Sequence, residues 1–404
     1  MKRSRAWWQE RSEVFLAGCA RLAEAEIGVD AVEAIFLCGS FASGEETIVL
    51  ETEIPILLSD IDFVVVVKSG NDLRTWFPRR TELGSACEAS LSDVRWGGHV
   101  EVGVMMIDDL RHLPARPGVY DMKNRGRVLS GNAGILDCIP EHRASDITVR
   151  EALLLIENRV ISVLGFCPAC SPAREDEPYR FLYEVTRVYT DIAVAALSIA
   201  GCYIPGYIAR RDLIRTKIEK EKHPLLSNLV SADVLSKIDC WTRFKVDPSL
   251  REGKAPSDAS SREKIWTRTA EDILWFWSQA MAQRDRFLPD LSIPMPAGAL
   301  AGLPRNYREW RPHLRAWRSF LSRFPVPRRI VLAASLGSDL FGAGPLDIVR
   351  EEGLRLLADR LARGPEAPVN GCRLGFPHHG GRWEKAAGEL SSLWKEIVFG
   401  RRGA

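Results

Sequence analysis

The pattern of apolar residues predicts a small sheet in the first third of the chain. Strand-like segments lie at residues 32–38, 61–67 and 99–106. The second segment ends in a run of valines, which is typical of a strand that is buried on both faces. Helical spacing over residues 10–27 predicts a helix that packs on this sheet, and residues 86–91 are a second helical candidate. Residues 119–140 predict a short helix followed by a strand.

Helical spacing dominates the rest of the chain. The predicted helices cover residues 148–164, 179–203, 208–222 and 265–282. A polar stretch at 247–262 and a proline-rich stretch at 289–304 predict breaks between helical parts. The pattern therefore divides the chain into three parts. These are a strand-containing domain at 1–145, a helical domain at 146–300 and a last helical segment at 301–404.

Composition and charge argue against several classes of protein. The chain of 404 residues is too long for one small core, and its net charge of +2 does not indicate nucleic acid as a partner. No apolar run reaches the length of a membrane span, and the first residues lack the apolar core of a signal peptide. The nine cysteines are scattered and odd in number, which fits reduced thiols. We therefore expect a cytoplasmic protein.

The most informative polar residues lie at the ends of the predicted strands. Gly39 and Ser40 follow the first strand, and a Gly-Ser turn that opens a helix offers backbone N–H groups and a hydroxyl to phosphate. Asp60 and Asp62 stand at the start of the second strand, so their side chains point to the same face. Two such carboxylates repel each other unless a cation lies between them, and Mg²⁺ suits a site of few carboxylates and phosphate oxygens. The pattern predicts a site for a metal-bound nucleoside triphosphate.

A third acid is expected on the third strand. Glu101 shares a face with His99, whereas valines occupy the other face. Asp93 is an alternative in a loop-like stretch, and Asp108 and Asp109 are alternatives that follow the strand. His99 itself is interpreted as a neighbour of the site or as a hydrogen-bonded strand residue rather than as a metal ligand.

Gly-Ser, Asp-x-Asp and a lone acid on a later strand, in this order, resemble the motif set of the DNA polymerase β-like nucleotidyltransferase superfamily. The resemblance implies an α/β (α+β) core with a mixed sheet, followed by a mostly helical region that shapes the acceptor pocket. It implies that Gly39 and Ser40 hold the triphosphate. It also implies that Asp60 and Asp62 bind two Mg²⁺ ions, with Mn²⁺ as an alternative. Glu101 would complete the metal site and help to activate the attacking hydroxyl.

The region that carries the motifs, residues 31–108, departs from the family in one respect. The stretch between Ser40 and Asp60 is about twice as long as is usual in the family. Because the cost of closing a loop grows slowly with its length, this insertion need not separate the two motifs. Residues 45–58 are expected to form either a short hairpin or a flap near the substrate.

The resemblance implies a Mg²⁺-dependent enzyme that moves a nucleoside monophosphate from a triphosphate to a hydroxyl-bearing acceptor and releases pyrophosphate. The weak overall charge and the large helical region favour a small molecule or a sugar as the acceptor. One alternative is a non-catalytic or regulatory nucleotide-binding protein of a toxin–antitoxin or immune pair. Another is an enzyme that modifies RNA ends or proteins. The sequence does not identify the base, the acceptor or the oligomeric state.

Three features lie outside these motifs. Residues 305–329 interleave arginines with aromatic residues, which can bind single-stranded nucleic acid, but the spacing favours a helix that buries its aromatic face. A phosphate-bearing acceptor, such as a nucleotide sugar or an RNA end, therefore stays open but is not favoured. Cys167 and Cys170 have no second pair of ligands, which favours a loop over a zinc site. Asp191 lies within an apolar helix, where we expect a neighbouring side chain to bind it.

Overall fold

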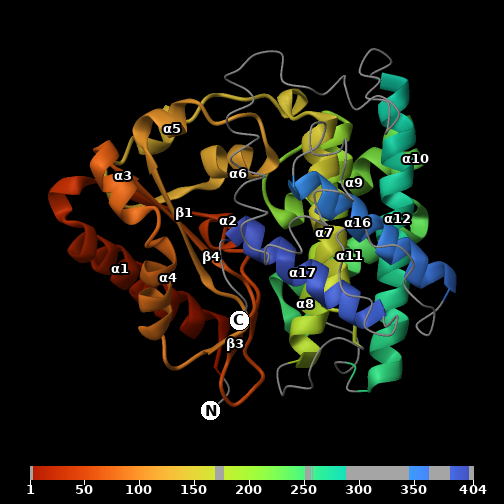
Figure 1. The fold of residues 1–404 in the computed structure, drawn as a ribbon, viewed down its shortest axis with the longest axis horizontal. Helices are drawn as coiled ribbons and strands as arrows, with labels where there is room; N and C mark the ends of the chain where they lie inside the picture. The colour runs from red at the N-terminus through yellow and green to blue at the C-terminus, as the bar shows by residue number, and fades with distance from the viewer. Residues whose placement is uncertain are drawn as a thin grey trace, which may run out of the picture. The chain divides into compact units, whose positions relative to one another are not determined.

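The computed structural model describes residues 3–168, 177–250, 256, 258–287, 345–363 and 383–399. Its N-terminal part is mixed α/β with a mixed sheet and its remainder is mostly helical, which confirms the coarse fold class (Figure 1). The chain forms two compact units. The first comprises Met1–Ala152 and Arg174–Ala255, and the second comprises Leu153–Ala173 and Pro256–Ala404. The three-part division near residues 145 and 300 stays a prediction.

Four strands form the main sheet of the first unit, in the order β6-β4-β1-β7. They are β1 (Val32–Cys38), β4 (Ile61–Val67), β6 (Val100–Met106) and β7 (Arg127–Gly131). Strands β4 and β6 are parallel, whereas β1 is antiparallel to both β4 and β7. The end of β1 therefore lies at the same edge of the sheet as the starts of β4 and β6. In this register Cys38 pairs with Asp62, and Asp62 pairs with Glu101.

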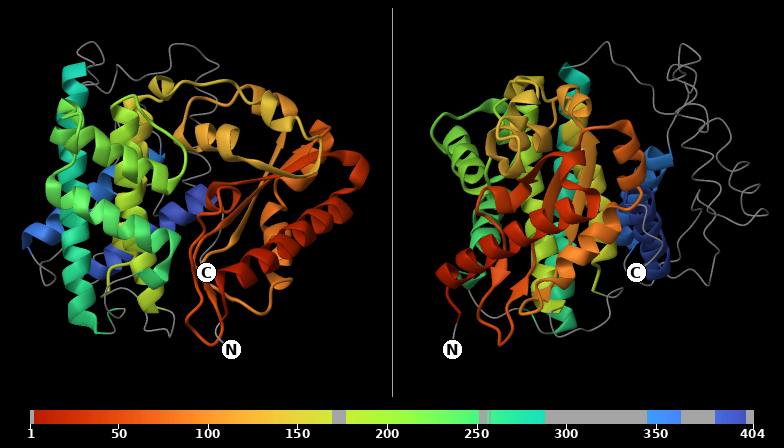
Figure 2. Two further views of the ribbon diagram at one scale, coloured as in Figure 1. Left: turned by 180° about the vertical axis from the view of Figure 1, so that it is seen from behind. Right: turned by 90° about the vertical axis from the view of Figure 1, so that its left-hand side faces the viewer.

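Both faces of the sheet are covered, which explains the valine run of β4. Phe63, Val65 and Val67 face a core that includes side chains of α1 (Arg5–Ile27) and α4 (Arg80–Ala89). Val64 and Val66 face a second core with α5 (Ile107–Arg111) and α6 (Pro117–Arg125). Helix α1 runs along one face of the sheet (Figure 1 and Figure 2). A strand with no solvent face needs no polar alternation.

The inserted stretch at residues 45–58 forms a hairpin. Its two short strands, β2 (Ile48–Val49) and β3 (Ile56–Leu57), are antiparallel and buried. Strand β3 also pairs in parallel with β5 (Arg95–Trp96), so the hairpin belongs to a second, three-stranded sheet. Of the two expectations for this insertion, the hairpin is confirmed.

Four helices complete the first unit. They are α8 (Glu177–Ile199), α9 (Tyr207–Glu219), α10 (Pro224–Leu229) and α11 (Ala232–Val246). Helix α11 packs on α8, where the rings of Tyr189 and Trp241 are stacked with centroids 6.1 Å apart. Helix α9 begins at a loop of the sheet domain, because the Glu45 carboxylate accepts the N–H groups of Tyr207 and Ile208 at 2.9 and 3.1 Å.

The second unit is helical in the ranges that are described. Its helices are α12 (Ala259–Phe287), α16 (Pro345–Arg363), α17 (Trp383–Phe399) and most of α7 (Val149–Gly165). Trp266 Nε1 donates to the carbonyl of Val163 at 2.8 Å and so binds α12 to α7. None of the helices in the described ranges is long and apolar enough to cross a membrane. The predicted features at 289–304 and 305–329, and Cys170, lie outside the described residues.

Candidate active site at the edge of the main sheet

The Gly-Ser turn lies directly after β1 and touches the second acid of the Asp-x-Asp motif. Gly39 opens the one-turn helix α2 (Gly39–Ala42) with φ of +69°, a conformation that favours glycine. A Cβ at this position would collide with the carboxylate of Asp62. Ser40, the next residue, is only 7 % exposed. The absence of a side chain at Gly39 therefore lets Asp62 lie against the turn.

Asp62 lies between the Gly-Ser turn and Glu101, in a strongly negative environment. Burial, followed by the charges of Asp60 and Glu101, raises the pKa of Asp62 to about 7. Burial and the charges of Asp62 and Glu101 also raise the pKa of the neighbouring Cys38 thiol. The negative charge of Asp62 is therefore destabilised by its neighbours, and a bound cation would offset this cost.

Asp60 is held by His99. Asp60 Oδ1 accepts the backbone N–H of His99 at 3.1 Å and lies 2.9 Å from His99 Nδ1. Because a carboxylate only accepts hydrogen bonds, Nδ1 is the nitrogen that carries the proton. Burial acts to raise the pKa of Asp60, but the His99 hydrogen bonds and the charge of Arg187 lower it to about 2. His99 Nε2 lies 3.9 Å from Glu101 Oε2, so the histidine stands between the two acids.

Glu101 alone, among the candidates for the third acid, lies at this edge of the sheet. Asp93 is bound to Arg11 of α1, with 3.0 Å between Asp93 Oδ2 and Arg11 Nε. Asp108 and Asp109 belong to α5, which follows the opposite end of β6. The strand register therefore places Glu101, of these candidates, beside Asp62.

The helices of the first unit add groups that the sequence analysis did not identify. Lys245 of α11 is buried, and its Nζ donates to Ser59 Oγ at 2.8 Å and to the hydroxyl of Tyr183 at 3.3 Å. Burial and the charge of Arg187 lower the pKa of Lys245 to about 7. Ser59 directly precedes Asp60, so a residue of α11 contacts the motif segment itself.

Arg187 of α8 contributes a positive charge that acts on two of the acids. Its charge favours the ionised form of both Asp60 and Asp62, although burial and the neighbouring acids still raise the pKa of Asp62. Arg187 Nη1 lies 3.3 Å from Glu184 Oε1 one turn earlier on the helix. Burial acts to lower the pKa of Arg187, but the charges of Glu184 and Asp60, followed by those of Tyr183 and Asp191, raise it. Asp191, the acid within an apolar helix, therefore lies on the side of α8 that carries Arg187.

A second buried polar cluster binds α9 to the sheet domain. The hydroxyl of Tyr203 donates to Asp121 Oδ1 at 2.7 Å, and Arg210 Nη1 donates to Asp121 Oδ2 at 3.0 Å. The Arg210 guanidinium lies 4.6 Å from the centre of the Tyr207 ring. Because Asp121 belongs to α6 and Arg210 to α9, this cluster fixes the helices beside the sheet edge that carries the acids.

The donor set fits a hard divalent cation in its chemistry. Three carboxylates on neighbouring strand positions, one of them with a raised pKa, are oxygen ligands of the kind that Mg²⁺ takes. Among the described residues, no group of three or more His, Cys, Asp or Glu side chains lies close enough together to hold a metal ion. The Asp60 carboxylate is bound to His99.

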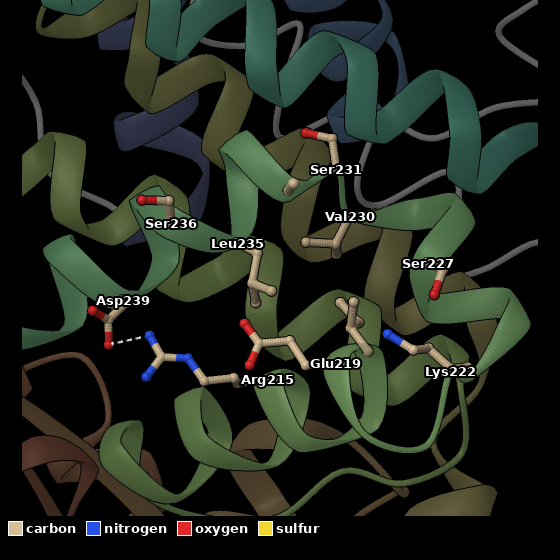
Figure 3. Close-up of a pocket in the computed structure, with 11 residues that line it drawn as sticks. Arg215, Glu219, Lys222, Ser227, Val230, Ser231, Leu235, Ser236 and Asp239 are labelled. Atoms are coloured by element: carbon tan, nitrogen blue, oxygen red, sulfur yellow. Dashed lines mark ion pairs between the residues drawn. The ribbon is translucent and has the colours of Figure 1, made fainter.

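A separate surface pocket of about 430 Å³ lies between α9, α10 and α11 (Figure 3). Arg215 and Asp239 face each other across one side, with Arg215 Nη2 2.9 Å from Asp239 Oδ1. Glu219 and Lys222 contribute one further charge of each sign. The volume is that of a small-molecule site, but the lining is electrically balanced and contains none of the residues named above at the sheet edge.

Comparison of the chain with models of protein families, with curated proteins and with solved structures finds no match in any of the three. The functional argument therefore depends on the geometry of the site. Gly39, Asp62 and Glu101 form one row across the sheet edge, with Ser40 in the turn beside it and Asp60 bound to His99.

Proposed function

We propose that this protein is a Mg²⁺-dependent nucleotidyltransferase. The observation that carries the proposal is the meeting, at one sheet edge, of a Gly-Ser turn with the carboxylates of Asp62 and Glu101 in register, next to Asp60. The mixed four-stranded sheet that presents them, with β1 between β4 and β7, supports a nucleotidyltransferase core. The raised pKa of Asp62 supports a cation as the partner of these acids.

Each residue at the edge has a definite part in the proposed reaction. The backbone of the turn at Gly39 and the hydroxyl of Ser40 bind the triphosphate. Asp60, Asp62 and Glu101 are the residues that would hold Mg²⁺, which would neutralise charge on the entering and leaving oxygens. Glu101 is exposed, so it can reach an acceptor hydroxyl and take its proton. The acceptor oxygen bonds to the α-phosphorus, the bond to the bridging oxygen breaks, and pyrophosphate leaves.

The helices α8, α9 and α11 are the proposed walls of the acceptor side. Their polar groups near the acids are cationic or aromatic, with Arg187, Lys245 and Tyr207 as the main examples. A small molecule or a sugar is the acceptor that we favour, and RNA ends and proteins are the alternatives. Specificity in such a site comes from the groups that pack across from the acids rather than from the shared chemistry.

A non-catalytic nucleotide-binding role has two observations in its favour. The Asp60 carboxylate is bound to His99, and the described residues contain no cluster of three metal-binding side chains. A regulatory protein that binds a nucleotide through the Gly-Ser turn would need no such cluster. This alternative predicts nucleotide binding without turnover.

One experiment separates these functions. The protein is incubated with each of the four ribonucleoside triphosphates and Mg²⁺ and a mixture of hydroxyl acceptors, while pyrophosphate release and nucleotide binding are followed. Pyrophosphate release that needs both the metal and an acceptor supports the enzyme. Tight binding without release supports the regulatory protein, and the absence of binding to any triphosphate contradicts both.

A further inference from the structure

Lys245 reaches the motif segment from a distant part of the chain. It lies near the end of α11, 186 residues away from Ser59 in sequence, yet its Nζ donates to Ser59 Oγ at 2.8 Å. Lys245 is 2 % exposed and Ser59 is fully buried. A buried ammonium group is costly unless it is hydrogen-bonded, so this contact determines where the lysine and the serine can lie.

The backbone of Lys245 holds a second segment of the sheet domain. Its carbonyl accepts the hydroxyl of Thr47 at 2.6 Å, and the N–H of Thr47 donates to Ser59 Oγ at 2.8 Å. Thr47 begins the inserted hairpin, and its own carbonyl accepts the N–H groups of Leu58 and Ser59. Lys245, Thr47 and Ser59 therefore form a closed set of buried hydrogen bonds that joins α11, the hairpin and the start of β4.

Two aromatic rings complete the surroundings of the lysine. Nζ lies 4.9 Å from the centre of the Tyr183 ring and 5.0 Å from that of Tyr207. Nζ also donates to the Tyr183 hydroxyl at 3.3 Å. With the rings on two sides and Ser59 on a third, the ammonium has one well-defined position.

The backbone of Ser59 is also in close contact with Gly98. A Cβ on Gly98 would lie 2.6 Å from the carbonyl oxygen of Ser59, so the two backbones are in close contact. Next along the chain, Asp60 accepts the N–H of His99, and the N–H of Ile61 donates to the carbonyl of His99 at 2.9 Å. A shift of Ser59 would therefore be passed to the hydrogen bonds that orient Asp60.

We propose that Lys245 is a positioning residue for the acid-bearing segment: by fixing Ser59 it sets the backbone from which Asp60 and Asp62 project. The kinetic consequence of this role rests on the proposed nucleotidyl transfer, whereas the structural consequence does not. The inserted hairpin contributes Thr47 to the same hydrogen bonds. The long spacing between the two motifs therefore supplies a residue that helps to hold Ser59.

The test compares Lys245→Met with Lys237→Met, the same change at a partly exposed position of α11 whose ammonium group forms an ion pair with Asp233. Amide hydrogen exchange at Ile61 and His99 reports the placement of Asp60 without any substrate. We expect exchange at these two amides to be at least about tenfold faster in Lys245→Met than in Lys237→Met, after correction for global stability. We also expect kcat to fall by about 10- to 100-fold, with KM for the triphosphate within about threefold of the wild type.

Ser59→Ala tests the same contact with a smaller change. If Lys245 acts through Ser59, the double variant is no worse than the more damaging single variant. Additive effects of the two changes, or unchanged exchange at Ile61 and His99 in a folded Lys245→Met or Ser59→Ala, would overturn the proposal. If the wild type transfers no nucleotide, the proposed function fails while the exchange comparison still decides the positioning role. If Lys245→Met does not fold, Ser59→Ala supplies both measurements.

Discussion

The acids and two of the cationic side chains of the candidate site come from different parts of the first unit. Asp62 and Glu101 belong to strands and Asp60 directly precedes β4, whereas α8 and α11 contribute Arg187 and Lys245. The surroundings shift the pKa values of the two acids of the Asp-x-Asp motif in opposite directions. Asp60 has a pKa of about 2 because His99 and Arg187 support its charge, while Asp62 has a pKa of about 7. Two acids of one motif are thus electrostatically different: the surroundings favour the charged form of Asp60 and disfavour that of Asp62.

The largest expected effect comes from removing the acidic side. We predict that the double variant Asp60→Asn/Asp62→Asn loses nucleotidyl transfer by at least about 10³-fold, because Glu101 is then the only one of the three proposed metal ligands that remains. The measurement is pyrophosphate release at saturating triphosphate. Glu51→Gln/Glu53→Gln is the matched control, since it removes two exposed charges with the same spacing from the inserted hairpin. Equal rates in the two variants would contradict the assignment of the acids.

The sheet side of the site could be predicted because strand geometry is local. In a strand, residues i and i+2 share a face, and the motif residues stand at the ends of β1, β4 and β6, which pair in the first unit. The apolar runs predicted β1 and β4 with the observed bounds, and the start of β6 to within one residue. The sequence predicts that His99 is a neighbour of the site or a hydrogen-bonded strand residue, but it does not predict the bond to Asp60. A side chain that turns back to a neighbouring strand leaves no periodic signal.

The helix side could not be predicted because it depends on packing between distant segments. Lys245 lies in an ordinary charged stretch of α11, and little in its sequence neighbourhood separates it from a partly exposed lysine such as Lys237. Its burial follows from how α11 packs against α8 and the hairpin. The one sequence signal is that Lys245 stands between Phe244 and Val246, at the apolar end of its helix. The same holds for Arg187: the sequence predicts the helix α8, but it does not predict which groups lie next to the polar side of that helix.

The next effect concerns the proton of the acceptor. We predict that Glu101→Gln lowers the rate of transfer by about 10²-fold, the usual scale for a positioned general base, while nucleotide binding persists through Asp62 and the turn at Gly39. Asp108→Asn is the control, because Asp108 is an exposed acid that lies beyond the opposite end of β6. The measurement is a side-by-side rate of pyrophosphate release. A larger loss in Asp108→Asn than in Glu101→Gln would mean that the wrong acid has been chosen.

A smaller effect is expected at the turn. Gly39→Ala places a Cβ against the Asp62 carboxylate, and we predict that it weakens binding of the triphosphate by about tenfold or more. Gly44→Ala is a close control, since Gly44 has the same φ of +69° but nothing within 4 Å of an added Cβ. Both variants share the cost of the backbone conformation, about 1–2 kcal/mol of folding stability. Equal loss of affinity in both would show that contact with Asp62 is not the reason for the glycine.

The smallest effect separates the two acids by the sign of their contribution to stability. Asp62 has a folded pKa of about 7 against an ordinary value of 3.8, so it destabilises the fold increasingly as pH rises from about 4 to 7. Asp62→Asn should therefore raise the free energy of unfolding at pH 8 in metal-free buffer. We expect about 1–2 kcal/mol after allowance for partial solvent screening, and less at pH 5.

Asp60 should behave in the opposite way. Its folded pKa of about 2 lies below 3.8, so its charge stabilises the fold above pH 4, and this contribution is lost as pH falls toward 2. Asp60→Asn should therefore lower stability at pH 8 by about 1 kcal/mol, and it should have little effect near pH 2. Urea denaturation of both variants at pH 5 and pH 8 gives the comparison. If the two substitutions change stability at pH 8 with the same sign, then His99 and Arg187 do not distinguish Asp60 from Asp62.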